Sequence, residues 1–209
     1  PGFKRHQRKI DTAALPRGGE RNEQADAIAD AIEAAGYDRI GLDHFALPAD
    51  AMAEAAGSGV LHRNFQGYTT DAADLLIGLG ASAIGRLPEG YVQNAAVTRD
   101  YLAAIARGDL ATVRGFALGD EDRLRADLIE RLMCDFRVDV ADVCDRHGAG
   151  VEAVADALPA LDRLAADGVL SRDGSVVEMA ADARTLVRVA AAAFDAYRSG
   201  SGAVHSQAV

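Results

Sequence analysis

The first regular pattern of apolar positions lies between residues 20 and 35, where apolar residues recur at spacings of three and four. This period predicts an amphipathic helix that ends at Gly36. Residues 37–45 follow with Ile40 and Leu42 on one face, which predicts a strand. Helix, glycine and strand in this order are typical of half of a βαβ unit, so we expect the strand at the end of a parallel, barrel-like sheet.

The next stretch, residues 48–85, has a different character. A short helix is expected over 48–56, because a proline opens it and glycines follow it. The string HRNFQGYTT, residues 62–70, has no apolar period of two or 3.6 and is predicted to be a loop. The run DLLIGLGASAIG, residues 74–85, is apolar and thinned by glycine, which predicts a buried strand that a ligand can approach closely. A polar loop beside such a strand is typical of a site at a strand end in an α/β fold.

Regular periods return beyond this stretch. Residues 88–94 are expected to form a connector, residues 98–106 a helix and residues 113–118 a short extended segment. From Gly119 onward, leucines on one face predict a longer helix over 120–136.

The remaining sequence predicts several short helices and one hairpin. Residues 138–147, 151–157 and 159–166 are expected to be helical, and the last of these begins with a proline. An Asp-Gly pair between two short apolar runs predicts a hairpin over 169–177, before a final helix over 181–197. Helices followed by a hairpin suggest a winged-helix-like domain.

The change of periodicity near Gly119 predicts a boundary between two domains. We expect an α/β region over residues 1–118 and a mostly helical domain with a hairpin over residues 119–198. The Gly- and Ser-rich tail, residues 199–209, is expected to be disordered.

The composition excludes several classes of function. The formal net charge is −10, whereas binding to nucleic acid or to anionic membranes is driven by Lys and Arg, so neither partner is expected. No apolar run approaches the ~20 residues that cross a bilayer. The sequence also shows no signal-peptide h-region, and the expected location is the cytoplasm.

The side chains of residues 62–70 are the best candidates for binding a ligand. Asn64 and Gln66 could recognise a nucleoside or amino-acid group with paired donors and acceptors. Phe65 or Tyr68 could cover a flat ring, and Arg63 could bind a carboxylate. The alternative is a polar loop whose side chains only stabilise the loop itself, and the sequence leaves both interpretations open.

Histidines offer a second kind of chemistry. Asp43 and His44 follow the predicted strand and could form a catalytic pair, or His44 could be a hydrogen-bonded structural residue. Adjacent strand residues point to opposite faces, which weakens the pair. His44, His62 or His147 could instead be the axial ligand of a haem. No catalytic residue is assigned.

The two cysteines, Cys134 and Cys144, do not form a metal-binding motif. A [4Fe–4S] cluster bound through a C-x-x-x-C-x-x-C motif needs three thiolates, and two cysteines with nine residues between them cannot supply these. We expect both to be buried structural thiols and assign no metal site.

Three strings carry a resemblance to a known family. DHFA, HRNFQGYTT and GLGASAIG, in this order and spacing, resemble the distal part of the oxygen-independent coproporphyrinogen III oxidases, which are radical S-adenosylmethionine enzymes of haem synthesis. The resemblance extends from QRKID at Gln7 to FDAY at Phe194. DHFA favours the oxidase over the related haem-chaperone branch.

This resemblance implies a fold and an activity. The fold would be the distal βα units of a partial radical S-adenosylmethionine barrel, followed by the winged-helix-like domain. The intact enzyme would bind two S-adenosylmethionine molecules and a [4Fe–4S] cluster. Through a 5′-deoxyadenosyl radical it would convert two propionates of coproporphyrinogen III to vinyl groups. The chain would need the missing N-terminal half of the barrel as its partner, would be inactive alone, and is expected to be a monomer.

The resemblance also implies positions for the site. Ile84 matches a residue that contacts the second S-adenosylmethionine through its backbone, with Phe65 and Gln66 in the corresponding lining. Arg63, Asn64 and Tyr68 would border the substrate. Three alternatives remain: a degenerate homologue without a cluster, a winged-helix binding module, and a haem-handling protein.

Overall fold

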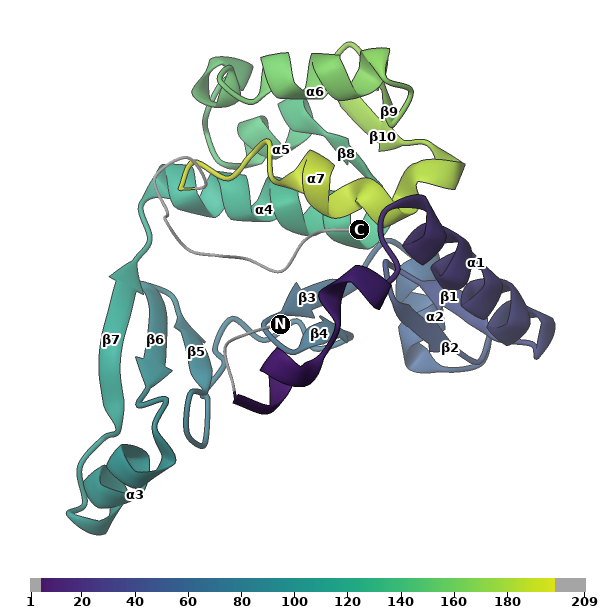
Figure 1. Ribbon diagram of the computed structural model, residues 1–209. Coiled ribbons are helices and arrows are strands. Elements are labelled where there is room, and N and C mark those ends of the chain that lie inside the picture. Colours follow the sequence, from purple (N-terminus) through teal and green to yellow (C-terminus); the bar gives the residue numbers. More distant parts are fainter. Residues whose placement is uncertain (1–4, 198–209) are drawn as a thin grey trace.

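A computed structural model describes residues 5–197, which form an α/β structure of helices and small sheets (Figure 1). The tail predicted to be disordered, residues 199–209, lies outside the described residues. The helices are α1 (Gly19–Ala34), α2 (Ala51–Gly57), α3 (Thr98–Ala106), α4 (Asp120–Asp135), α5 (Val140–Arg146), α6 (Leu158–Ala166) and α7 (Val187–Ala191). The strands are β1 (Asp38–Ile40), β2 (His44–Ala46), β3 (His62–Asn64), β4 (Gly67–Thr69), β5 (Ile84–Leu87), β6 (Gly90–Asn94), β7 (Thr112–Ala117), β8 (Arg137–Asp139), β9 (Leu170–Asp173) and β10 (Val176–Met179).

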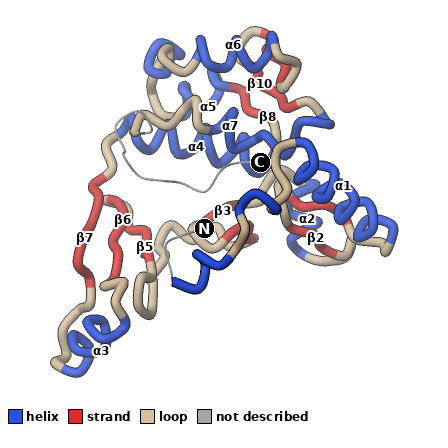
Figure 2. Tube along the Cα trace, in the orientation of Figure 1, coloured by secondary structure: helices blue, strands red, loops and turns tan. Residues whose placement is uncertain are grey.

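All strand pairs among the described residues are antiparallel. They form two hairpins, β1–β2 and β3–β4, and two three-stranded sheets with the orders β5-β6-β7 and β8-β10-β9. Figure 2 shows how these short strands are separated by loops and helices. The expected parallel sheet is therefore not formed within residues 5–197.

Residues 37–45 form the β1–β2 hairpin instead of the single strand that the pattern predicted. The chain turns at Gly41, whose φ of +58° is accessible to glycine at little cost. A Cβ atom at this position would overlap the ring of Tyr68, from a distant part of the sequence. The turn therefore depends on tertiary packing, which the local pattern does not contain.

The polar string of residues 62–70 also forms a hairpin, where a loop was predicted. His62 pairs with Thr69, and Asn64 pairs with Gly67, so the turn lies at Phe65 and Gln66. A hairpin with a two-residue turn can form without alternating apolar residues in its strands, when side chains from other parts of the chain cover those strands. This explains why periodicity alone missed the hairpin.

The glycine-thinned run, residues 74–85, is largely an exposed loop and not the predicted buried strand. Leu75, Ile77 and Leu79 are exposed, and only its end enters β5. The predicted connector, residues 88–94, contains β6, the central strand of the β5-β6-β7 sheet. This sheet extends away from the C-terminal helices, with α3 at its tip (Figure 1).

The expected helices over 98–106, 120–136 and 159–166 are confirmed by α3, α4 and α6. The hairpin with Gly174 at its turn is confirmed by β9 and β10, and β8 adds a third strand. The final helix is shorter than predicted, because α7 ends at Ala191 and Tyr197 lies beyond it, 56% exposed.

Helix α4 contacts both apolar cores of the described chain. Its leucines, among them Leu124, Leu128 and Leu132, belong to the large core shared with α5, α6, α7 and the β8-β10-β9 sheet. From the same helix, Cys134 packs into a small core with Ile40, the other members being Ala46, Ala55, Leu61 and Tyr68. This helix therefore connects the first half of the chain to the second.

Candidate functional site

A cavity of about 240 Å³ lies between the turn of the β3–β4 hairpin and the loop that leads into β5. Three of the residues predicted to bind a cofactor, Phe65, Gln66 and Ile84, line it together. The other lining residues are Leu76, Ile77, Gly78, Leu79, Ser82 and Ala83. Residues that are far apart in sequence thus meet at one concave surface.

The hairpin turn presents an aromatic ring and a carboxamide to this cavity. Phe65 is 53% exposed and meets Tyr91 of β6 edge to face, with ring centroids 5.0 Å apart. The Asn64 side chain accepts a hydrogen bond from the Gln66 backbone N–H at 2.8 Å, which fixes the turn. Within residues 5–197, the Gln66 side-chain amide makes no hydrogen bond, so it is available to a ligand.

The backbone polar groups of Ile84 face the cavity as well. In an antiparallel strand, consecutive residues direct their N–H and C=O groups to opposite edges, so residues two apart share an edge. Arg86 exchanges two hydrogen bonds with Leu76 on the outer edge of β5, so the polar groups of Ile84 face that edge too. They lie beside Gly78, where a Cβ would come within 2.9 Å of the Ile84 carbonyl. The absence of a side chain at Gly78 therefore lets the loop approach β5 closely.

The loop beside the cavity is held by residues that the sequence analysis did not single out. Asn94 donates from its side-chain amide to the carbonyls of Gly78 and Gly80, at 3.0 and 3.1 Å. The Gly80 N–H donates to the Tyr101 hydroxyl at 3.2 Å. Asn94 had been placed in a connector, and no local signal marked its role.

Tyr68 lies away from the cavity, in the small core. Its hydroxyl donates to the Met133 carbonyl at 2.9 Å and accepts from the Leu42 N–H at 3.0 Å. Burial raises the pKa of Tyr68 above its usual value. The hydroxyl therefore uses both its donor and its acceptor, and Tyr68 joins the β3–β4 hairpin to the β1–β2 hairpin and to α4.

Arg63 also lies outside the cavity lining, but it keeps an unused donor. Its guanidinium lies 5.5 Å from the centre of the Tyr68 ring, a cation–π contact. Its Nε is buried without a hydrogen-bond partner, and the same holds for Nε of Arg39. A buried donor without a partner costs free energy, so an anionic group in this region would be favoured.

Asp43 and His44 do form a pair, contrary to the expectation that they point to opposite faces. The His44 Nδ1 lies 2.9 Å from the Asp43 carboxylate, because Asp43 lies in the turn that precedes His44, the first residue of β2. Arg188 approaches the other carboxylate oxygen at 3.9 Å. Neither member of the pair lines the cavity.

The cysteines are free and buried, as expected for structural thiols. They belong to different cores, Cys134 to the small one and Cys144 to the large one. Burial raises the pKa of Cys134 to about 12, so this thiol is protonated at neutral pH. Within residues 5–197, no cluster of three or more His, Cys, Asp or Glu side chains could hold a metal ion.

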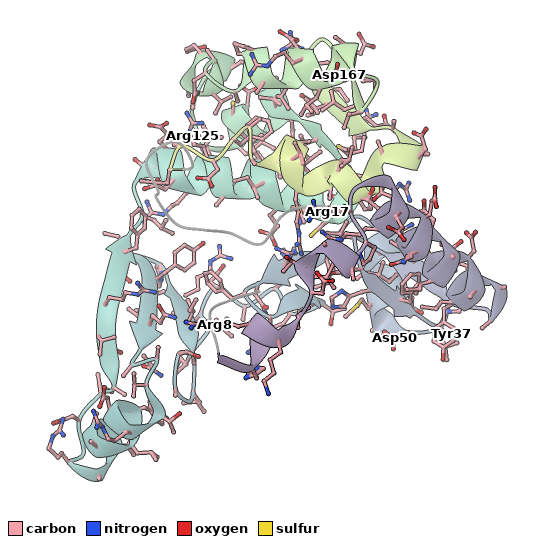
Figure 3. The ribbon with its side chains drawn as sticks, in the orientation of Figure 1. Arg8, Arg17, Tyr37, Asp50, Arg125 and Asp167 are labelled. Atoms are coloured by element: carbon pink, nitrogen blue, oxygen red, sulfur yellow. The ribbon has the colours of Figure 1, made fainter. Side chains whose placement is uncertain are left out.

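A larger concavity of about 670 Å³ lies at the start of α4, around Arg125 (Figure 3). This arginine is 6% exposed and is engaged with several neighbours. It pairs with Glu121 and Asp156, each at 2.8 Å, and donates to the carbonyls of Phe194 and Ala153. Four of its five N–H donors are used in this way, so the guanidinium joins α4 to the later helices.

Comparison with known proteins shows that the chain is similar to part of a group of enzymes. It is 53% identical to the oxygen-independent coproporphyrinogen III oxidase of Bradyrhizobium diazoefficiens and 43% identical to that of Cereibacter sphaeroides, over 100% and 94% of this chain. The chain is homologous to the C-terminal part of these oxidases. It spans about half of their length, 46% and 44%. No protein-family model matches the chain.

The comparison with solved structures agrees with the sequence comparison. The coproporphyrinogen III oxidase HemN of Escherichia coli, described as a radical S-adenosylmethionine enzyme, matches with a TM-score of 0.83 and 36% identity. The match covers 91% of this chain and 44% of HemN. Among residues 5–197, no helix is long and apolar enough to cross a membrane.

Proposed function

We propose that this chain forms the C-terminal part of an oxygen-independent coproporphyrinogen III oxidase. Such an enzyme decarboxylates two propionates of coproporphyrinogen III oxidatively to vinyl groups and yields protoporphyrinogen IX. The observation that carries the proposal is the meeting of Phe65, Gln66 and Ile84 at one cavity, in a chain 53% identical to such an oxidase. By itself, the chain is expected to make no product.

The residues at the cavity fit S-adenosylmethionine. Phe65 offers an exposed ring face for the adenine, and the unused amide of Gln66 offers both donors and an acceptor. Ile84, which also lines the cavity, adds backbone groups that suit the amino-acid part. In the enzyme, the S-adenosylmethionine at the cluster would supply the radical chemistry, while this chain would bind and orient a second molecule.

The proposed [4Fe–4S] cluster would be held outside this chain. The full sequence contains two cysteines, fewer than the three thiolates that the cluster needs. Both are buried, and the raised pKa of Cys134 disfavours its thiolate form. The first half of a complete barrel would therefore be the necessary partner of the chain.

Substrate carboxylates are proposed to bind near the β3–β4 hairpin. Arg63 is the main candidate, because its buried Nε has no partner and could donate to a carboxylate. Asn64 is close by on the turn, although its side-chain oxygen is occupied by the Gln66 N–H. Tyr68 would act indirectly, since its ring supports Arg63.

The second half of the chain is proposed to be a winged-helix-like domain that begins near Gly119. In support, α4, α5, α6 and the β8-β10-β9 sheet share the large core, and β9 and β10 form the wing. Nucleic acid is not the proposed partner. Most arginines of this domain are paired with carboxylates, for example Arg137 with Glu178 and Arg146 with Asp127. The monomeric state and the cytoplasmic location remain predictions. Two free cysteines are consistent with the cytoplasm, where thiols stay reduced.

A hybrid enzyme tests the proposed function. In this hybrid, the present chain replaces the matching part of the Bradyrhizobium diazoefficiens oxidase, to which it is 53% identical. The reconstituted hybrid should convert coproporphyrinogen III to protoporphyrinogen IX under anaerobic conditions. The proposal fails if the hybrid carries its cluster and folds like the parent enzyme but makes no product while the parent does.

A further inference from the structure

Glu130 is the side chain through which α4 reaches the first strand of the β3–β4 hairpin. Its Oε1 accepts a hydrogen bond from the Arg63 backbone N–H at 3.0 Å and lies 3.0 Å from Nδ1 of His62. The Glu130 side chain is 21% exposed, so solvent competes little for this carboxylate. The turn carrying Phe65 and Gln66 follows directly after this strand.

Neighbouring residues of α4 hold the base of the same hairpin. Arg131 donates to the carbonyls of Leu61 and Gly59, at 2.8 and 3.2 Å. The Met133 carbonyl accepts the hydrogen bond from Tyr68 of β4. The hairpin is therefore attached to α4 along its base, and Glu130 makes the attachment on β3 that lies nearest to the turn.

We propose that Glu130 is a positioning residue that sets the distance between the hairpin turn and the loop of residues 76–83. The width of the cavity follows from this distance. The proposal deepens the proposed function, on which it rests only for the identity of the ligand, S-adenosylmethionine. Without the carboxylate, the Arg63 N–H and the His62 ring lose their shared acceptor, and β3 must shift to regain hydrogen bonds. A shift of about 1 Å in a positioning element can cost ~10²-fold in rate.

Two substitutions at Glu130 distinguish the effect of the hydrogen-bond acceptor from the effect of side-chain size. Glu130→Met keeps the length of the side chain and removes the oxygen acceptor, whereas Glu130→Gln keeps an oxygen at the same reach. Asp127→Asn is the matched control. Asp127 lies one turn earlier on α4, is 22% exposed and contacts His147 at 3.1 Å. Asp127 therefore also forms a carboxylate–histidine pair from α4, but it does not contact the β3–β4 hairpin.

Fluorine NMR of the chain labelled with fluorophenylalanine reports the cavity directly. The Phe65 ring lies edge to face with Tyr91, so its resonance is sensitive to movement of the turn. The resonance is assigned by its loss in Phe65→Leu. The dissociation constant for S-adenosylmethionine is measured in parallel on the hybrid enzyme.

We expect Glu130→Met to shift the Phe65 resonance and to weaken S-adenosylmethionine binding about tenfold. Glu130→Gln should restore both, and Asp127→Asn should change neither. The proposal is overturned if the Phe65 resonance stays in place in Glu130→Met, or if Asp127→Asn moves it equally. If Glu130→Met does not fold, Glu130→Asp, whose carboxylate falls short of β3, must show the same shift. If the hybrid binds no S-adenosylmethionine beyond its cluster-bound molecule, the proposed ligand is wrong, and the Phe65 resonance still decides the positioning role.

Discussion

Individual side chains in the HRNFQGYTT string have distinct tasks that the string itself does not reveal. Phe65 and Gln66 face the cavity, whereas Tyr68 is buried and joins Leu42 to Met133. The sequence singled out this string, because polar and aromatic residues without a period are unusual. It could not separate the residues that line the cavity from those buried in the structure, because that separation depends on partners far along the chain, such as Glu130.

Gln66→Ala should lower turnover of the hybrid enzyme more than its stability. The side-chain amide makes no hydrogen bond among the described residues, so its loss should change the free energy of unfolding by less than ~0.5 kcal/mol. Loss of a hydrogen bond to a bound ligand costs about 0.5–1.5 kcal/mol, and misplacement of the ligand adds to the loss of rate. Thermal midpoint and decarboxylation rate are measured together. If Gln66→Ala unfolds the protein but leaves the rate per folded molecule unchanged, the assignment of Gln66 to the ligand site is contradicted.

Cys134 should make the protein less stable at alkaline pH. Its thiol ionises near pH 9.0 when unfolded and near a pKa of about 12 when folded, because burial disfavours the thiolate. The stabilising contribution is therefore complete below pH 9 and is lost as pH rises toward 12. We expect the stability difference between wild type and Cys134→Ala to shrink between pH 8 and pH 10.5 in urea unfolding. A difference that does not vary with pH would contradict the burial of this thiol.

At the scale of elements, long periodic helices were predictable, and so was the β9–β10 hairpin with its Asp-Gly turn, but two hairpins without such a signal were not. Helices α1 and α4 follow their apolar periods within one or two residues of the predicted bounds. The β1–β2 and β3–β4 hairpins were missed, because Gly41 turns under the ring of Tyr68 and no apolar alternation marks the polar strands. The run from Leu75 to Leu79 was misread as buried, because its own sequence cannot say what covers it.

Gly41→Ala should destabilise the protein by about 2 kcal/mol or more. The substitution combines strain at φ +58° with overlap between the new Cβ and the Tyr68 ring. Gly174→Ala is the matched control, since Gly174 has φ +59° and no atom within 4 Å of the new Cβ. The control should cost about 1 kcal/mol from backbone strain alone. Equal losses in chemical denaturation would show that the Tyr68 contact is unimportant.

At the scale of the whole molecule, α4 links two cores that differ greatly in size. The large core contains α4 to α7 with their sheet, and the small core contains the two hairpins and α2. The β5-β6-β7 sheet and α3 extend away from both (Figure 1). The cavity lies between the hairpin fixed to α4 and the loop fixed to this sheet, so its shape depends on how these parts are held together.

The number of S-adenosylmethionine molecules bound by the hybrid enzyme tests the central claim most directly. The claim is that the cavity at Phe65, Gln66 and Ile84 holds a second molecule beside the one bound at the cluster. Equilibrium dialysis of the reconstituted hybrid should show two molecules per polypeptide. The double variant Phe65→Ala/Gln66→Ala should show one, with its iron content unchanged. Two molecules retained by the double variant would contradict the account.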